Sequence, residues 1–149
     1  MTSGYTLSNG TLSLDNVGGL LIQSGGSRTT SLSSNFTLNV SSARTLKLQI
    51  NSAPAGGLAV NSAAAININS GTLQISSAGN AGTNRIEQSG KVSFTGTSTV
   101  NNAAAFGYFS NFSGEIALAG TTTWNSSGSS TGNTTISGAL TGNGTLNYR

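Results

Sequence analysis

Only three residues of this chain carry a carboxylate side chain: Asp15, Glu87 and Glu115. Cleavage of a polysaccharide needs two such groups facing one bond, or one carboxylate with a basic partner. Glu87 and Glu115 are separated by about one period of the apolar pattern along the chain, but that pattern assigns them to different strands and different faces. We interpret Arg85 and Lys91 as surface ion partners, and we predict that the chain is not an enzyme.

Other chemistry is limited by composition, because the sequence contains no cysteine and no histidine. This excludes a disulfide, a thiol nucleophile and an imidazole base, and it removes the usual zinc ligands. The glycine-rich turns match neither a phosphate-binding loop nor a dinucleotide fingerprint, and no calcium-binding repeat occurs. Six scattered cations and a net charge of +3 form no basic patch. We expect no cofactor, no metal and no nucleic-acid partner.

Threonines form the first candidate ligand face. Thr95, Thr97 and Thr99 alternate along one expected strand, and Thr121 and Thr123 follow the first two by one period of the apolar pattern. On stacked strands these residues would form a two-rung threonine array on the outer surface. Regular threonine rows on flat solenoids can bind ice, whereas the alternative is that threonine simply suits an exposed strand position.

Aromatic residues form the second candidate site. Tyr108, Phe109 and Trp124 lie within a stretch that also contains Phe106 and Phe112. Exposed aromatic faces stack against sugar rings, so these three residues are a candidate glycan patch. The alternative is that the aromatic side chains fill a wider part of the core.

These residues are positioned by short strands that recur in three interleaved series. Each series repeats at about 26 residues, and the strands alternate apolar and polar side chains, the period of two of half-buried strands. The first series comprises Leu12/Leu14, Leu38/Val40, Ile66/Ile68, Val92/Phe94, Ile116/Leu118 and Leu140. The second comprises Leu21, Leu46/Leu48, Leu73/Ile75, Val100, Trp124 and Leu146/Tyr148, and the third Leu32, Leu58/Val60, Ile86, Phe109/Phe112 and Ile136. Recurrence of this kind is typical of a solenoid.

We therefore predict an all-β fold, a right-handed three-sided parallel β-helix of about five to six turns. Residues 1–149 would form a single domain, either a mature chain or a segment of a longer solenoid. An antiparallel β-sandwich is the alternative, supported by short strands and by the Asn-Gly pairs at 9–10 and 143–144. Because Met1 is followed by Thr-Ser-Gly-Tyr, without a basic segment or an apolar run, we expect neither a signal peptide nor a transmembrane helix.

Residues 111–149 resemble the passenger-associated β-strand repeats of autotransporter and related bacterial surface proteins. The resemblance depends on Phe112-Ser113-Gly114, on Ile136-Ser137-Gly138-Ala139-Leu140 and on Gly142-Asn143-Gly144-Thr145-Leu146. It implies a parallel β-helix that is exported across the outer membrane and displayed on the cell surface. Members of this class serve as adhesins, biofilm factors, stalks or carriers of enzymes.

The expected function is that of an extracellular structural or adhesive solenoid. Charged residues make up 6 % of the chain, where about 25 % is usual, so hydroxyls and amides must wet the surface. A solenoid also exposes unpaired rungs at both ends, which recruit other strands. We expect self-association through these rungs, surface glycans as a second kind of partner, and no insertion into a membrane. The alternatives are a glycan- or ice-binding solenoid and then a polysaccharide-active enzyme.

Overall fold

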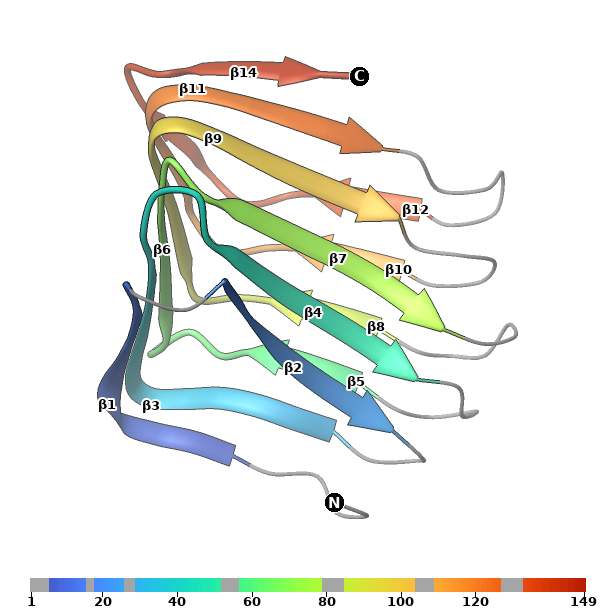
Figure 1. Cartoon of the computed structure of the whole chain (residues 1–149). Coiled ribbons are helices and arrows are strands. Elements are labelled where there is room, and N and C mark those ends of the chain that lie inside the picture. Colours follow the sequence, from blue (N-terminus) through green and yellow to red (C-terminus); the bar gives the residue numbers. More distant parts are fainter. Residues whose placement is uncertain are drawn as a thin grey trace.

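The computed structural model describes residues 6–15, 18–25, 29–51, 57–78, 85–103, 109–126 and 133–149. Strands are the only regular elements in these ranges, and hydrogen bonds join them into one sheet that coils around an axis (Figure 1). The strands are β1 (Thr6–Leu14), β2 (Gly19–Gly25), β3 (Thr29–Val40), β4 (Thr45–Asn51), β5 (Gly57–Val60), β6 (Ala65–Asn69), β7 (Thr72–Ala78), β8 (Arg85–Gln88), β9 (Lys91–Ala103), β10 (Phe109–Phe112), β11 (Ile116–Ser126), β12 (Asn133–Ile136), β13 (Leu140–Gly142) and β14 (Thr145–Tyr148).

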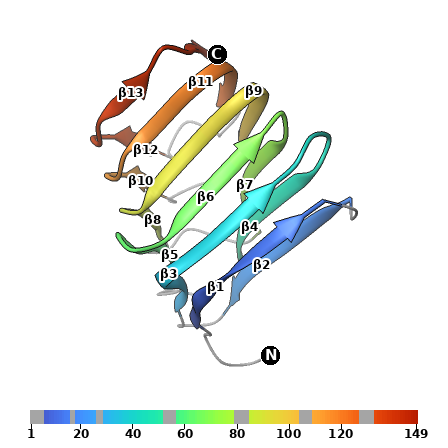
Figure 2. The same ribbon diagram turned by 90° about the vertical axis from the view of Figure 1, so that its left-hand side faces the viewer.

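Three parallel ladders form the three faces of the coil. The first face contains the C-terminal parts of β1 and β3, then β6, the N-terminal parts of β9 and β11, and β13 (Figure 2). The second face contains β2, β4, β7, the C-terminal parts of β9 and β11, and β14. The third contains the N-terminal parts of β1 and β3, then β5, β8, β10 and β12.

All of the pairings between described strands are parallel, so the predicted β-helix is confirmed and the antiparallel sandwich is wrong. In Figure 1 the second-face strands run toward the right, the fainter strands behind them return toward the left, and the chain rises from N to C. This path is right-handed, the hand that parallel crossovers strongly prefer. Each ladder contains six strand segments in the described ranges, in line with the approximate expectation of five to six turns.

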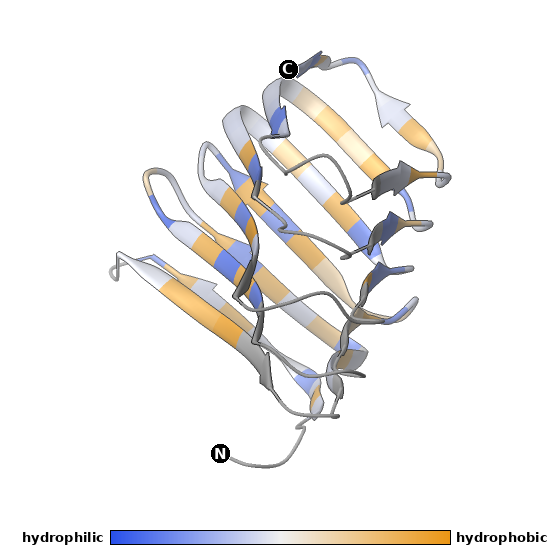
Figure 3. Ribbon diagram, turned by 90° about the vertical axis from the view of Figure 1, so that its right-hand side faces the viewer, coloured by the Kyte–Doolittle hydropathy of each residue, from blue (hydrophilic) through white to orange (hydrophobic). Residues whose placement is uncertain are grey.

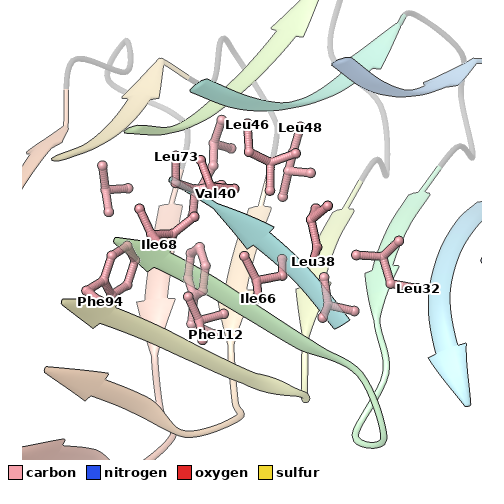
Figure 4. Close-up of a cluster of buried hydrophobic side chains, with 14 of the residues drawn as sticks. Leu32, Leu38, Val40, Leu46, Leu48, Ile66, Ile68, Leu73, Phe94 and Phe112 are labelled. Atoms are coloured by element: carbon pink, nitrogen blue, oxygen red, sulfur yellow. The ribbon is translucent and has the colours of Figure 1, made fainter. Parts of the chain in front are cut away.

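Side chains alternate between the interior and the surface along each strand. The apolar members of the alternation stack into columns and form one continuous core (Figure 4), while hydrophilic and hydrophobic bands alternate along the ribbons (Figure 3). One predicted core position is wrong: Leu20 is the half-buried member of the second-face column, and Leu21 points outward with 48 % of its surface exposed. The two leucines are adjacent, and a shift of one residue moves a side chain to the opposite face.

The repeat length varies because one corner changes length. In the first-face column from Leu12 to Leu140, the early turns are longer than the late ones. Between the third and first faces, Val60 and Ile66 are six positions apart, whereas Phe112 and Ile116 are only four apart. The last three turns share one strict period, because every ladder steps by the same amount between them.

Glycine makes the shorter corner possible. Gly90, Gly114 and Gly138 occupy the same position of this corner in successive turns. A Cβ atom on Gly114 would lie 2.2 Å from the carbonyl oxygen of Gly90, and one on Gly138 would lie 1.9 Å from that of Gly114. Only a residue without a side chain permits this approach of one turn to the next.

Candidate interaction surfaces

The three carboxylates are held by hydrogen bonds to neighbouring turns. Glu87 in β8 lies on the third face and accepts a bond from Asn111 Nδ2 at 3.0 Å. Glu115 immediately precedes β11 on the first face. The two glutamates thus lie on different faces, as predicted. Asp15 follows β1 and accepts a bond from the Ser41 hydroxyl of the next turn.

Lys91 pairs with Glu115 rather than with Glu87. Lys91 Nζ lies 3.1 Å from Glu115 Oε1, and the Thr141 hydroxyl donates to the same oxygen at 2.7 Å. The hydrogen bond from Thr141 and then that from Lys91 lower the pKa of Glu115 below its ordinary value of 4.5. The cluster is exposed to solvent, with 48 % of the Lys91 side chain accessible, so we regard it as a link between three successive turns.

Among the residues that the structure places, no three acidic, cysteine or histidine side chains gather into a group that could hold a metal ion. The same residues include no helix with the length and apolar character required to cross a bilayer.

The predicted threonine array is divided by a corner of the coil. β9 pairs with β6 as far as Thr95 and with β7 from Thr99 onward, and between them Gly96 has a φ of 62°. Thr95 is therefore exposed on the first face, whereas Thr99 lies half-buried on the second. The prediction that Thr95, Thr97 and Thr99 share one face is wrong, because the strand bends between them.

The predicted register of the threonines is also wrong. Thr121 lies beside Thr97, and Thr123 lies beside Thr99, with Ala119 beside Thr95. The prediction applied the average repeat of the whole chain, but the glycine corner makes this turn shorter than the average. The register therefore differs by two positions from the expected one.

A longer threonine column on the second face was missed. It crosses β4, β7, β9 and β11, and Thr97, Thr121 and Thr145 form a second column at the adjoining corner. The second-face column comprises Thr45, Thr72, Thr99 and Thr123, all of them half-buried. Its last step is shorter than the two before it, so a search at a single period does not find it. Each of these threonines immediately precedes an inward apolar residue. This shared pattern identifies the column only when the number of residues in each corner is also known.

Trp124, predicted as part of the aromatic glycan patch, is buried in the core. This side chain is 1 % exposed and packs edge to face on Phe112, with ring centroids 5.0 Å apart and planes at 84°. It belongs to the inward column of the second face, so it cannot stack against a sugar, and the core-filling alternative applies to it. Tyr108 lies outside the described residues, and of Phe109 the structure describes only the backbone, within β10.

Amide ladders follow the axis on the outer faces. On the first face Asn67 Nδ2 donates to Asn39 Oδ1 at 2.9 Å, and Asn39 Nδ2 donates to Ser13 Oγ at 3.3 Å. On the second face Asn125 Nδ2 donates to Asn101 Oδ1 at 3.0 Å. Stacked amides of this kind reinforce the backbone ladders between parallel turns. They connect the turns from outside as the apolar columns connect them from inside.

The first and last described strands of each ladder lack a partner strand on one side. In the described ranges β12, β13 and β14 have partners on one side only, as do β2 and the whole of β1. All of the large apolar side chains found exposed lie on these strands: Leu12, Leu21, Ile136, Leu140 and Tyr148. Exposure reaches 52 % for Leu140 and 60 % for Tyr148. The ends thus combine unpaired backbone groups with apolar surface, the properties of an association site.

No protein-family model, characterised protein or solved structure matches this chain. The resemblance of residues 111–149 to passenger-associated repeats accordingly stays a prediction.

Proposed function

We propose that this chain is a structural element, a rigid β-solenoid scaffold on the outside of a bacterial cell whose ends are covered by further β-strands. It has no catalytic role. It acts as a rigid rod that projects from the cell surface and holds its three faces at a fixed spacing. The observation that carries this proposal is the arrangement of exposed apolar residues, which lie on the terminal strands of a core that is otherwise continuous.

The continuity of the three ladders supports mechanical rigidity. Each turn contributes parallel backbone hydrogen bonds on all three sides, inward columns such as Leu46–Leu73–Val100–Trp124, and outward amide bonds such as Asn67 to Asn39. A turn buries its apolar side chains only by stacking on its neighbours. Separating two turns therefore requires breaking all three kinds of contact together.

The mechanical role is tested by force spectroscopy on a single chain held between two handle domains attached at its ends. A scaffold is expected to resist and then to unfold in a few abrupt steps, because ladders on three faces must yield together. A gradual extension at the low force of an unstructured linker would refute the proposal. The measurement uses isolated chains, so it is independent of any association between copies.

The cell-surface location is supported by a low-charge surface of hydroxyls and amides and by the resemblance of residues 111–149 to surface-displayed repeats. It is tested by treating intact cells of the source organism with a protease and probing for the chain with an antibody. Loss of the antibody signal without lysis is expected. Full protection in intact cells, with cleavage after lysis, would place the chain inside.

A ligand-binding role is the second candidate, and the column of Thr45, Thr72, Thr99 and Thr123 favours it. Stacked turns repeat at about 4.8 Å, so the column presents hydroxyl and methyl groups at regular intervals to ice or to a repetitive glycan. Ice recrystallisation and glycan-array binding are measured for the wild type and for Thr99→Lys. Asn69→Lys, on the exposed first face, is the control. Ice growth and glycan signals that the wild type leaves unchanged would reject this role.

A further inference from the structure

We infer that the C-terminal end of the coil receives the N-terminal end of a second copy of this chain, so that copies stack head to tail into a linear fibre. This inference rests on the proposed scaffold function and adds the identity and orientation of the covering strands. An interface that joins different ends of identical subunits does not close on itself, and it propagates as a filament.

The inward columns match across such a junction. Extending the observed register by one turn places Leu12 of the second copy on Leu140, because both belong to the column that also contains Leu38 and Ile116. The exposed fractions of these two residues, 37 % for Leu12 and 52 % for Leu140, would be available for mutual burial.

Two further columns continue in the same way. Leu7, half-buried at the N-terminal end, would lie on Ile136 of the third face. Leu20 would lie on Tyr148 of the second face, which is exposed at the C-terminal end. Each face thus supplies an apolar pair at the junction, and the core of one copy becomes continuous with that of the next.

The backbone edges are compatible with head-to-tail stacking. Contact between opposite ends keeps every strand parallel to its new neighbour, as all of the described pairs are, whereas contact between two like ends would require antiparallel pairing. The corner between the first and second faces has the same length in both terminal turns, six positions from Leu14 to Leu20 and from Gly142 to Tyr148.

The corner between the third and first faces differs in length by one residue between the two terminal turns. Leu7 and Leu12 are five positions apart, and Ile136 and Leu140 are four apart. The coil already accommodates such a difference through the register shift between Ser8 and Gly10, where β1 pairs with β3. A mismatch of one residue at the junction is therefore within what this fold tolerates.

Gly10 supports the same orientation. It lies in the corner column that continues through Phe36 and Ala64 to Gly90, Gly114 and Gly138. In the isolated chain a Cβ atom on Gly10 would meet nothing within 4 Å, so its small size has no packing role there. In the stack Gly10 lies on Gly138, where each glycine of the column approaches the carbonyl beneath it.

The polar residues at the junction are also compatible. Asp15 of the second copy would align with Asn143, whose amide can donate to a carboxylate as Asn111 does to Glu87. Leu21, exposed on the outer side of β2, would align with Arg149, which follows β14 and lies beside Asn125. No like charges meet at these positions.

The test uses two variants that block different ends. Leu12→Glu places a charge on the N-terminal end, and Leu140→Glu places one on the C-terminal end. Burial of an unpaired charge is expected to weaken association by more than about 100-fold. Each variant alone should sediment as a monomer of 14.8 kDa, because every head-to-tail contact would include a blocked end. Their equimolar mixture should form a dimer through the two free ends, and the wild type should form longer polymers.

The control is Asn69→Glu, which places the same charge on a side face and should polymerise as the wild type does. Urea unfolding checks that each variant folds, and Leu7→Glu with Ile136→Glu is the replacement pair if one does not. A wild type or a mixture that stays monomeric over the whole concentration range would overturn the inference. So would dimerisation of either blocked variant alone, which would indicate contact between like ends. Neither result depends on the force measurement that tests the scaffold.

Discussion

Substitution of one corner glycine should have opposite consequences at two positions of the same column. Gly114→Ala inserts a Cβ atom 2.2 Å from the carbonyl oxygen of Gly90 and 2.5 Å from that of Ser89. Both contacts are with backbone, which cannot rotate away as a side chain can. Ordinary carbon contacts begin at 3.4 Å, so the two turns must separate by about 1 Å at this corner.

The cost follows from what this separation breaks. The backbone nitrogens of Ser113 and Gly114 both donate to the Gln88 carbonyl, at 2.8 and 3.0 Å. Two strained hydrogen bonds at about 1 kcal/mol each, added to about 1 kcal/mol or more for overpacking, give a loss of about 3 kcal/mol. With a urea slope of about 2 kcal/mol/M, the unfolding midpoint should fall by about 1.5 M.

Gly10→Ala is the matched control, because a Cβ atom there meets nothing within 4 Å. Its expected change is within about 0.5 kcal/mol, or slightly stabilising since alanine restricts the unfolded chain. Urea unfolding followed by circular dichroism at a low, monomeric concentration compares the two. Equal midpoints for both variants would refute the close approach of turns at this corner. At high concentration Gly10→Ala should also lower the degree of polymerisation, because the stack places it on Gly138.

Three further predictions concern the core and the exposed charge cluster. Ile68→Ala removes a fully buried side chain and should lower the free energy of unfolding in urea by about 3 kcal/mol. Leu140→Ala, at the exposed C-terminal end, should lower it by less than half as much in the monomer. Similar losses for the two variants would contradict the exposure of Leu140. Thr141→Val removes a donor to Glu115, so the pKa of that carboxyl should rise toward 4.5 in an NMR titration, and an unchanged pKa would exclude the bond. Because the pKa of Glu115 is lowered in the folded state, its contribution to stability is present above the unfolded pKa and is lost as pH falls through the folded pKa. The difference in urea unfolding midpoint between the wild type and Glu115→Gln should therefore shrink in acid. A difference that persists or grows in acid would contradict the lowered pKa.

The architecture could be predicted from the sequence because it depends on patterns that survive local variation. Alternation such as that from Leu46 to Leu48 fixes which side chains face inward, and recurrence from Leu38 to Ile66 fixes which strands stack. Both follow from a period of two along a strand and from the need of every turn to bury its apolar side on a neighbour. Errors of one or two positions in the repeat do not change this result.

The candidate surface was less predictable because it depends on the exact register. The average repeat predicts that Thr97 lies beside Thr123, but it lies beside Thr121. The number of residues in this turn depends on how closely Gly114 approaches Gly90. Thr95 and Thr97 were assigned to one face, although the strand bends at Gly96. Corner geometry determines both, and a glycine in a sequence does not reveal whether its backbone bends or simply passes close to another turn.

The same corners give the coil two different ends, and this difference is the basis for directional assembly. The last three turns share one strict period, with Gly90, Gly114 and Gly138 in one column, so the C-terminal end presents a turn with the shape of those beneath it. The N-terminal end has a longer corner with a register shift, and its residue in this column is Gly10. Two C-terminal ends would have to pair antiparallel, unlike every described pair of strands. An N-terminal end placed on a C-terminal end keeps the parallel pairing and places Gly10 on Gly138. The inferred head-to-tail stack is therefore the arrangement that continues the parallel pairing of the rest of the coil.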